Sequence, residues 1–288
     1  MVLEEQILRF YLKVSSFLLI PIIYFLYFFF IKEINLKNEY IFVKKNDNYE
    51  NIIKENIVDN KINQFIYKLS LKVFIYSNKN IHYGRFYFNK KNNFINFIKI
   101  LTSPSKYYEK ITVVEGSSKY QLNNILSKNF DVFEEIPYIE IIADSYLFSP
   151  GSSFKDFKKK LNERYLSIKQ KYKNNKLLEK YSFDEIIIIG SLIEKEGLDY
   201  NDKRKIFSVI DNRLSINMKL QIDATVIYAI TKGIKNLSRK LTYRDLEINS
   251  PYNTYKIYGL PPKPISYVSY KTIELIFENY KTDYLYYF

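Results

Sequence analysis

The sequence predicts an α+β protein with one transmembrane helix near its N-terminus, a small α+β module after it, and a mainly helical C-terminal half with a few strands. Three observations lead to this prediction. An uncharged apolar run extends from Val14 to Ile31. Short apolar runs then alternate with polar ones through residues 33–110. The C-terminal half contains amphipathic segments that begin at capping signals, which are typical of helices.

Composition sets limits on the kind of protein. The chain has 288 residues, and 47% of them are hydrophobic, which is enough to build a core and argues against wholesale disorder. The net charge of +13 could suit nucleic acid or an anionic membrane, but the lysines are scattered, and we expect no nucleic-acid partner. Cys is absent and His82 is the only His, so we expect no disulfide, no metal site and no cofactor.

The apolar run is bounded by Lys13 and Lys32. Its length is at the lower end of what spans a bilayer as a helix, where roughly 20 residues are typical. The competing interpretation is a cleaved signal peptide, but no small-residue cleavage site follows, and the run is long for that role. We therefore expect an uncleaved membrane helix over residues 14–32, whose orientation the flanking charges do not decide.

Local patterns predict most of the regular structure. Residues 71–76 and 84–88 are predicted to be strands joined by a turn, and residues 94–101 a short helix. Three capping boxes are predicted to open helices, at Ser118, Ser153 and Ser182. The helix after Ser182 should stop at Gly197, and further helices are expected at about 202–216, 224–232 and 269–280. Between the last two lies a Pro- and Gly-rich loop, residues 250–265, of the kind that more often carries function.

The helix that ends IEKEG places two glutamates at its C-terminal end. Glu194 and Glu196 are two residues apart, so they point about 200° away from each other and cannot act as a matched pair on one substrate. Glu194 shares its face with Gly190 and Ser191, whose small side chains would leave room for a ligand. Apolar surroundings and the negative end of the helix dipole would favour a protonated general acid there. The alternative is a glutamate paired with Lys195 or Arg213 near a helix end.

Several motifs occur in a fixed order. SLIEKE (191–196) is followed by NRL (212–214), M-x-LQ-x-D-x-TV-x-Y (218–228), SPYNTY (250–255) and GLPPKPI (259–265), and VEG (114–116) and DSYLF (144–148) lie upstream. The chain resembles the endolytic murein transglycosylase, or YceG-like, family over nearly its whole length, about 14 to 288. SPYNTY together with GLPP carries most of this specificity.

The resemblance implies an architecture and a location. We expect a short cytoplasmic N-terminus (1–13), the transmembrane helix (14–32), a LysM-like α+β region (33–150) and a YceG-like catalytic domain (151–288). The implied location is the bacterial inner membrane, crossed once, with the catalytic domain in the periplasm. Peptidoglycan glycan strands are the implied substrate, and peptidoglycan synthases are candidate partners.

The implied reaction cuts the bond between N-acetylmuramic acid and N-acetylglucosamine and leaves a 1,6-anhydro end. The first Glu of the EKE motif, Glu194, is implied to be the catalytic acid and base. One carboxylate is enough, because the sugar's own 6-hydroxyl closes on C1 in place of water. Candidate substrate-binding residues are Ser191, Gln221, Asp223, Asn253 and Tyr255. Loop or cap bonding is an equal alternative for each of Gln221, Asp223, Asn253 and Tyr255, with Asp223 a candidate helix N-cap and Asn253 a candidate turn residue.

The chain departs from the family pattern at Val114, Gly197, Ala224 and Lys263. It also stops at YLYYF, where the family pattern continues into a hairpin with a Gly-His-x-Phe motif. Two further hypotheses therefore stay open beside the active enzyme. One is a catalytically weak or inactive membrane-tethered scaffold that binds peptidoglycan. The other is an unrelated basic membrane protein, whose binding should weaken steeply with salt.

Overall fold

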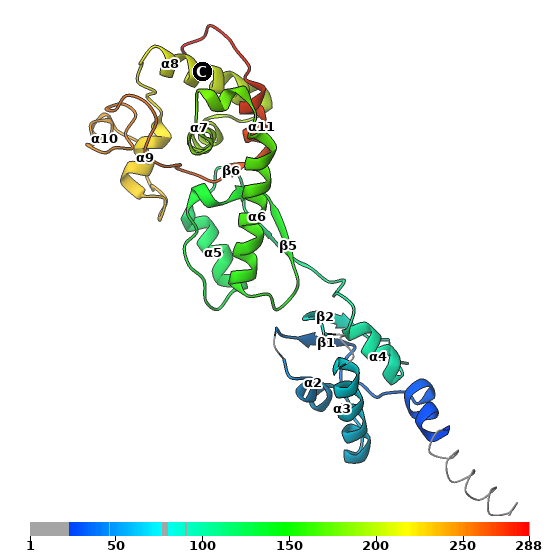
Figure 1. The fold of residues 1–288 in the computed structure, drawn as a ribbon. Coiled ribbons are helices and arrows are strands. Elements are labelled where there is room, and N and C mark those ends of the chain that lie inside the picture. Colours follow the sequence, from blue (N-terminus) through cyan, green and yellow to red (C-terminus); the bar gives the residue numbers. More distant parts are fainter. Residues whose placement is uncertain (1–22, 46, 77–79, 90, 288) are drawn as a thin grey trace, which may run out of the picture. The chain divides into compact units, whose positions relative to one another are not determined.

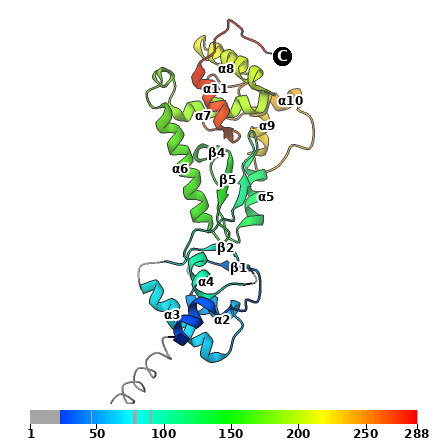
Figure 2. The same ribbon diagram turned by 90° about the vertical axis from the view of Figure 1, so that its right-hand side faces the viewer.

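A computed structural model describes residues 23–45, 47–76, 80–89 and 91–287 of the chain. The chain divides into two compact units. The first unit comprises residues up to Glu109 together with Phe148–Ser152, and the second comprises Lys110–Leu147 and Ser153–Phe288. Figure 1 and Figure 2 show the elements of each unit. Residues 110–147 thus cluster with the C-terminal unit, whereas we had grouped residues 33–150; the LysM-like assignment of the first region stays a prediction.

The first unit is built on a two-stranded antiparallel sheet. Strands β1 (Tyr40–Val43) and β2 (Gly84–Tyr87) pair with Ile41 opposite Phe86. Three helices accompany the sheet: α2 (Tyr49–Asn56), α3 (Lys61–Tyr76) and α4 (Phe94–Leu101). Each strand buries every second residue, which gives the sheet one apolar face toward a core rich in Phe and Ile.

The expected strand at residues 71–76 is wrong, because this segment is the last part of helix α3. Its short apolar run fits a buried strand and a buried helix equally well. The helical period becomes visible only further upstream, where Tyr67 and Leu71, four residues apart, are both fully buried. The expected turn at 77–80 lies almost wholly outside the described residues.

The predicted membrane helix is described only in its second half, since residues 14–22 lie outside the described residues. Within the described part of the chain, no helix is long and apolar enough to cross a membrane. The described half ends in a π-helical turn, η1 (Tyr27–Ile31). Phe28 and Phe29 of that turn are buried in the core of the first unit, against Tyr67 and Phe94.

The second unit contains two short strand pairs among its helices. Strand β3 (Glu109–Thr112) pairs with β5 (Ser145–Phe148), and β4 (Ile142–Ala143) pairs in parallel with β6 (Val268–Ser269). Helices α5 (Lys119–Asn129) and α6 (Phe154–Tyr172) open at Ser118 and Ser153, and both have the expected capping box. The short turns η2 (Tyr138–Glu140) and η3 (Lys176–Glu179) complete this part.

The remaining helices surround α7 (Phe183–Glu196), which opens at the capping box of Ser182. Figure 1 shows α7 almost end-on among its neighbours. These are α8 (Tyr200–Ser215), α9 (Asp223–Thr231) and α11 (Tyr270–Glu278), with the short α10 (Tyr243–Leu246) beside α9. The eight consecutive residues of α7 from Ile186 to Ile193 are all buried. The second unit is therefore mainly helical with few strands, as predicted.

Candidate active site

Helix α7 approaches its neighbours closely where its small residues lie. A Cβ added at Gly190 would meet Cγ1 of Val268 at 2.6 Å, so β6 fills the space beside this glycine. Ser191 is fully buried, donates to the Ile188 carbonyl and accepts from the Ile265 amide. The expected room for a ligand one turn before Glu194 is therefore wrong, because residues 265–268 occupy it.

Gly197 ends α7, but not as a left-handed C-cap. Its φ is −89°, which any residue adopts. An added Cβ would instead meet Cγ of Lys203 at 2.5 Å, so the glycine allows α8 to pack close to the end of α7. This close approach brings Lys203 next to Glu194.

Glu194 of α7 forms hydrogen bonds to α8 and to the N-terminus of α11. Its Oε2 accepts from the ammonium of Lys203 at 2.5 Å, and its Oε1 accepts from the backbone amide and hydroxyl of Ser269 at 2.9 and 2.7 Å. Ser269 is the N-cap of α11, whose dipole also favours a negative charge. The Glu194 side chain is 0% exposed. The prediction of apolar surroundings for this carboxylate is wrong, because Lys203 and Ser269 bind it. The sequence alone did not reveal these two partners.

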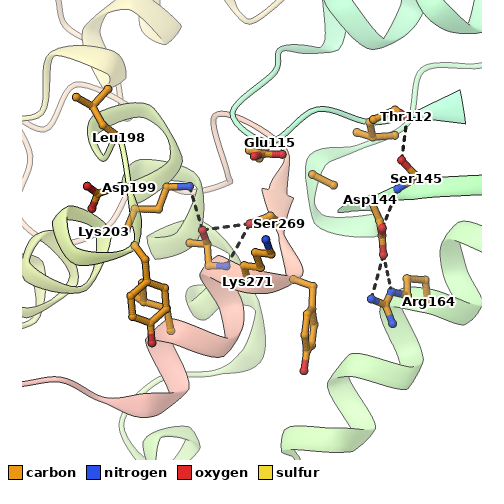
Figure 3. Close-up of a pocket in the computed structure, with 16 residues that line it drawn as sticks. Thr112, Glu115, Asp144, Ser145, Arg164, Leu198, Asp199, Lys203, Ser269 and Lys271 are labelled. Carbon is orange, nitrogen blue, oxygen red and sulfur yellow. Dashed lines mark hydrogen bonds and ion pairs between the residues drawn. The ribbon is translucent and has the colours of Figure 1, made fainter.

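A pocket of about 470 Å³ lies on the other side of these partners. Figure 3 shows Lys203 and Ser269 on one wall, Glu115 above them, and Asp144 with Arg164 on the opposite wall. Arg164 and Asp144 form an ion pair at 3.0 Å. Both upstream motifs thus reach this pocket, since Glu115 belongs to VEG and Asp144 to DSYLF.

Gly116 of the VEG motif lies against the backbone of Glu194. It has a φ of +68°, and an added Cβ would meet the Glu194 carbonyl oxygen at 3.0 Å. Its amide donates to the Tyr267 carbonyl, and its carbonyl accepts from the Lys195 ammonium at 3.3 Å. The glycine is needed here both for its left-handed backbone and for close approach.

Glu196 points to a different part of the unit, as the helical period requires. It is half-buried, and its Oε2 accepts from the Tyr287 hydroxyl at 3.5 Å. Burial, and then the negative charge of Asp223, raise the pKa of Glu196. The Tyr287 hydroxyl, the charge of Lys195 and the amide of Ala224 oppose this rise without cancelling it.

Two of the motif residues, Asp223 and Tyr255, interact electrostatically with Glu196. The hydroxyl of Tyr255 donates to Oδ1 of Asp223 at 2.6 Å. Burial, this hydrogen bond and then the negative charges of Asp223 and Glu196 raise the pKa of Tyr255 to about 12. Gln221 is exposed, with a φ of +51°, and its amide donates to the Thr254 carbonyl. A non-glycine residue with such a φ is uncommon.

Asn253 holds the loop that carries Tyr255. Its side chain is fully buried, and its amide nitrogen donates to the carbonyls of Leu246 and Ile248 at 2.9 and 2.8 Å. Its Oδ1 accepts from the Tyr255 amide at 3.0 Å. Asn253 and Ser191 thus have partners within the protein, whereas Gln221, Asp223 and Tyr255 keep surface that a ligand could reach.

A second pocket, of about 760 Å³, opens beside Glu196. Its lining includes Glu196, Leu198 and three tyrosines of the C-terminal segment, but not Asp223 or Tyr255. The three tyrosines are Tyr284, Tyr286 and Tyr287. Aromatic faces beside an acid are a surface on which sugar rings can lie.

The NRL motif holds this C-terminal segment in position. The Asn212 side chain donates to the carbonyls of Thr282 and Tyr284 at 2.7 and 2.9 Å. Arg213 is buried and donates to the carbonyls of Leu285 and Leu220, each at 2.7 Å. Arg213 therefore links the C-terminal segment to the start of the LQ-x-D motif, on either side of Glu196.

The described residues contain no group of His, Asp and Glu side chains that could hold a metal ion.

The sequence matches the YceG-like family over residues 41–288. The chain belongs to this family.

Three known proteins resemble this YceG-like chain. A Bacillus subtilis (strain 168) protein named endolytic murein transglycosylase is 34% identical over 200 residues, which cover 65% of this chain and 54% of that protein. A Streptococcus pneumoniae (strain D39) protein of the same name is 32% identical over 180 residues, covering 62% and 30%. This chain thus spans about half or less of these relatives. A crystal structure of a yceG-like protein from Listeria monocytogenes matches with a TM-score of 0.55 at 25% identity, covering 86% of this chain and 93% of that one.

Sequence reasoning on this YceG-like chain missed three site residues. Glu196 was set aside, Arg213 was considered only as an ion-pair partner of Glu194, and Tyr287 was not singled out. The helical period separated the two glutamates correctly. It could not say which of them faces the residues at 221–223 and 253–255, since that depends on tertiary packing.

Proposed function

We propose that this YceG-like protein is an endolytic murein transglycosylase that cuts peptidoglycan glycan strands and leaves 1,6-anhydro ends. The names of the two bacterial relatives support this activity. We further propose that Glu196, rather than Glu194, is its general acid and base. One observation carries this choice: the Glu196 carboxylate borders an open, tyrosine-lined pocket, whereas the Glu194 side chain is fully covered and has both oxygens bonded.

The chemistry requires one carboxyl group that begins protonated. Glu196 would donate its proton to the glycosidic oxygen as the bond from that oxygen to C1 breaks. The 6-hydroxyl of the same sugar would then attack C1, and its proton would return to Glu196, which restores the acid. No water molecule takes part in this reaction, so no second carboxylate is needed to activate a water molecule. The raised pKa of Glu196 increases the protonated fraction at a given pH, as a general acid needs.

Neighbouring groups would support the charge that develops. C1 becomes positive as the bond breaks, and the carboxylate of Asp223 is an anion close enough to Glu196 to raise its pKa. Tyr255 orients Asp223 through its hydrogen bond, and Asn253 orients Tyr255. Tyr284 and Tyr286 would carry the sugar rings.

The location is also a proposal. The apolar run at 14–32 supports a single-pass inner-membrane protein with its catalytic domain in the periplasm. Nascent glycan strands would be within reach there, and peptidoglycan synthases would be neighbours in the same membrane.

The test compares the two glutamates directly. The full chain, Glu196→Gln and Glu194→Gln are incubated with isolated peptidoglycan, and anhydro-muropeptides are measured by mass spectrometry. We expect Glu196→Gln to lose about 100-fold or more of the activity, the usual contribution of a general acid. We expect Glu194→Gln to lose thermal stability while the folded fraction still cuts glycan.

Two other results would change the conclusion. Loss of activity in folded Glu194→Gln with activity kept in Glu196→Gln would return the catalytic role to Glu194. Glycan binding without anhydro ends in the wild type would instead support the scaffold hypothesis.

A further inference from the structure

A third pocket, of about 520 Å³, lies entirely within the first unit and far along the sequence from the glutamates. It is formed by β2, α4 and the segment that follows α4. Three cationic side chains line it: Arg85, Lys99 and Lys106. No acidic residue is among the described residues of its lining.

In the part of the chain that the structure describes, the charged groups of Arg85, Lys99 and Lys106 have no ion pair and no hydrogen bond. Lys32 of the same unit, by contrast, binds Asp59 at 2.7 Å. Three like charges around one pocket repel each other, and an anion that enters it would relieve this repulsion.

The other lining groups indicate what kind of anion fits. The side-chain amide of Asn96 lines the pocket and has no partner among the described residues, so it can donate a hydrogen bond. Tyr87 and Tyr107 form an aromatic wall, with their rings 5.1 and 5.9 Å from the ring of Tyr40. Both are substantially exposed, at 40% and 39%, so their faces are open to a ligand.

We propose that this pocket binds a phosphate monoester or a diphosphate group, carried either on a sugar or on a lipid. A single carboxylate or a phosphodiester carries one charge and would leave two of the three cations uncompensated, whereas a phosphate monoester or a diphosphate carries about two or more. The planar guanidinium of Arg85 suits two phosphate oxygens at once, and the lysines act as point charges. The tyrosine wall favours a sugar-linked diphosphate over a lipid headgroup, because a sugar ring can lie on an aromatic face.

The test measures binding of inorganic pyrophosphate to the full chain by calorimetry in 0.15 M salt, where non-specific attraction is screened (a Debye length of about 8 Å). The pocket variant is Arg85→Gln/Lys99→Gln/Lys106→Gln. Its matched control is Lys54→Gln/Lys61→Gln/Lys72→Gln, which removes the same charge from exposed positions on α2 and α3. We expect the pocket variant to bind about tenfold or more weakly and the control to bind within about twofold of the wild type.

Two further ligands identify the source of the phosphate. UDP-N-acetylglucosamine supplies a sugar diphosphate, and dihexanoyl phosphatidic acid below its micelle concentration supplies a lipid phosphate monoester. Tyr87→Ala/Tyr107→Ala should weaken the sugar diphosphate and leave pyrophosphate unchanged. Tighter binding of the lipid, unaffected by the tyrosines, would assign the headgroup as the source.

The proposal is overturned if pyrophosphate does not bind, if the two triple variants lose affinity equally, or if acetate competes as well as pyrophosphate. The proposed function does not depend on this result, because Glu196 and its pocket belong to the other unit.

Discussion

Two glutamates separated by one lysine have opposite surroundings in this protein. Glu194 accepts three hydrogen bonds and has no exposed side-chain surface, while Glu196 is half-buried beside a pocket. The difference comes from the partners that each face of α7 meets. Lys203 and Ser269 meet one face, whereas Asp223 and Tyr287 meet the other. The sequence fixes the angle between the two side chains, but their partners come from distant segments that only the folded chain brings near.

Gly116 gives a test of the contact with Glu194 at the residue scale. Gly116→Ala adds both a left-handed strain and a contact at 3.0 Å with the Glu194 carbonyl oxygen. Gly259→Ala is the matched control, because Gly259 has a φ of +79° and nothing within 4 Å of its added Cβ. We expect both to destabilise by about 1 kcal/mol from strain and Gly116→Ala by about 1 kcal/mol more. Thermal unfolding measures this, and equal shifts for the two variants would show that the close approach contributes nothing.

At the scale of elements, the sequence predicted the starting points of helices better than it predicted whether a short apolar run is a helix or a strand. The capping boxes at Ser118, Ser153 and Ser182 are all present, because a cap involves residues only three positions apart. The prediction of a strand at residues 71–76 is wrong, because a short apolar run fits a strand and a helix equally well. Only the preceding helical turn, which lies outside this run, distinguishes the two. A functional role for the loop at 250–265 stays a prediction, and the hydrogen bonds by which Asn253 holds this loop were not evident from the sequence.

Asn253 gives the prediction that belongs to this loop. Asn253→Ala removes three hydrogen bonds and leaves two carbonyls and the Tyr255 amide without these partners. We expect a loss of about 2–4 kcal/mol in unfolding free energy, together with lower production of anhydro ends in the folded fraction because Tyr255 moves. Asn129→Ala, at the exposed end of α5, is the control and should change stability by about 0.5 kcal/mol or less. Unchanged activity in folded Asn253→Ala would remove Tyr255 from the proposed site.

At the scale of the whole molecule, each compact unit has its own hydrophobic core and a carboxylate that several donors bind, of which Asp211 is buried and Asp59 is half-buried. Asp59 serves the first unit and Asp211 the second, where it accepts from Lys180, Lys281 and Tyr181. Burial acts to raise the pKa of Asp211, but the hydrogen bonds from these three residues outweigh it and lower the pKa. The pKa of Asp59 is also lowered, since hydrogen bonds from Lys32 and Asn63 outweigh burial. Composition predicted a core but not this division, which depends on contacts between residues far apart in the chain.

These two carboxylates predict how the units unfold. Because the folded pKa of each lies below its unfolded value, each contributes stability above the unfolded value, and this contribution is lost as the pH falls through the folded pKa. We expect two transitions by differential scanning calorimetry at pH 7. Asp211→Asn should lower one of them by about 4–8 °C, from a loss of about 2 kcal/mol, and Asp59→Asn should lower the other. The gap between each variant and the wild type should begin to close as the pH falls below the unfolded value of 3.8 and should go on closing as the pH falls through the folded pKa. A single transition that both variants lower equally would mean that the two cores unfold as one.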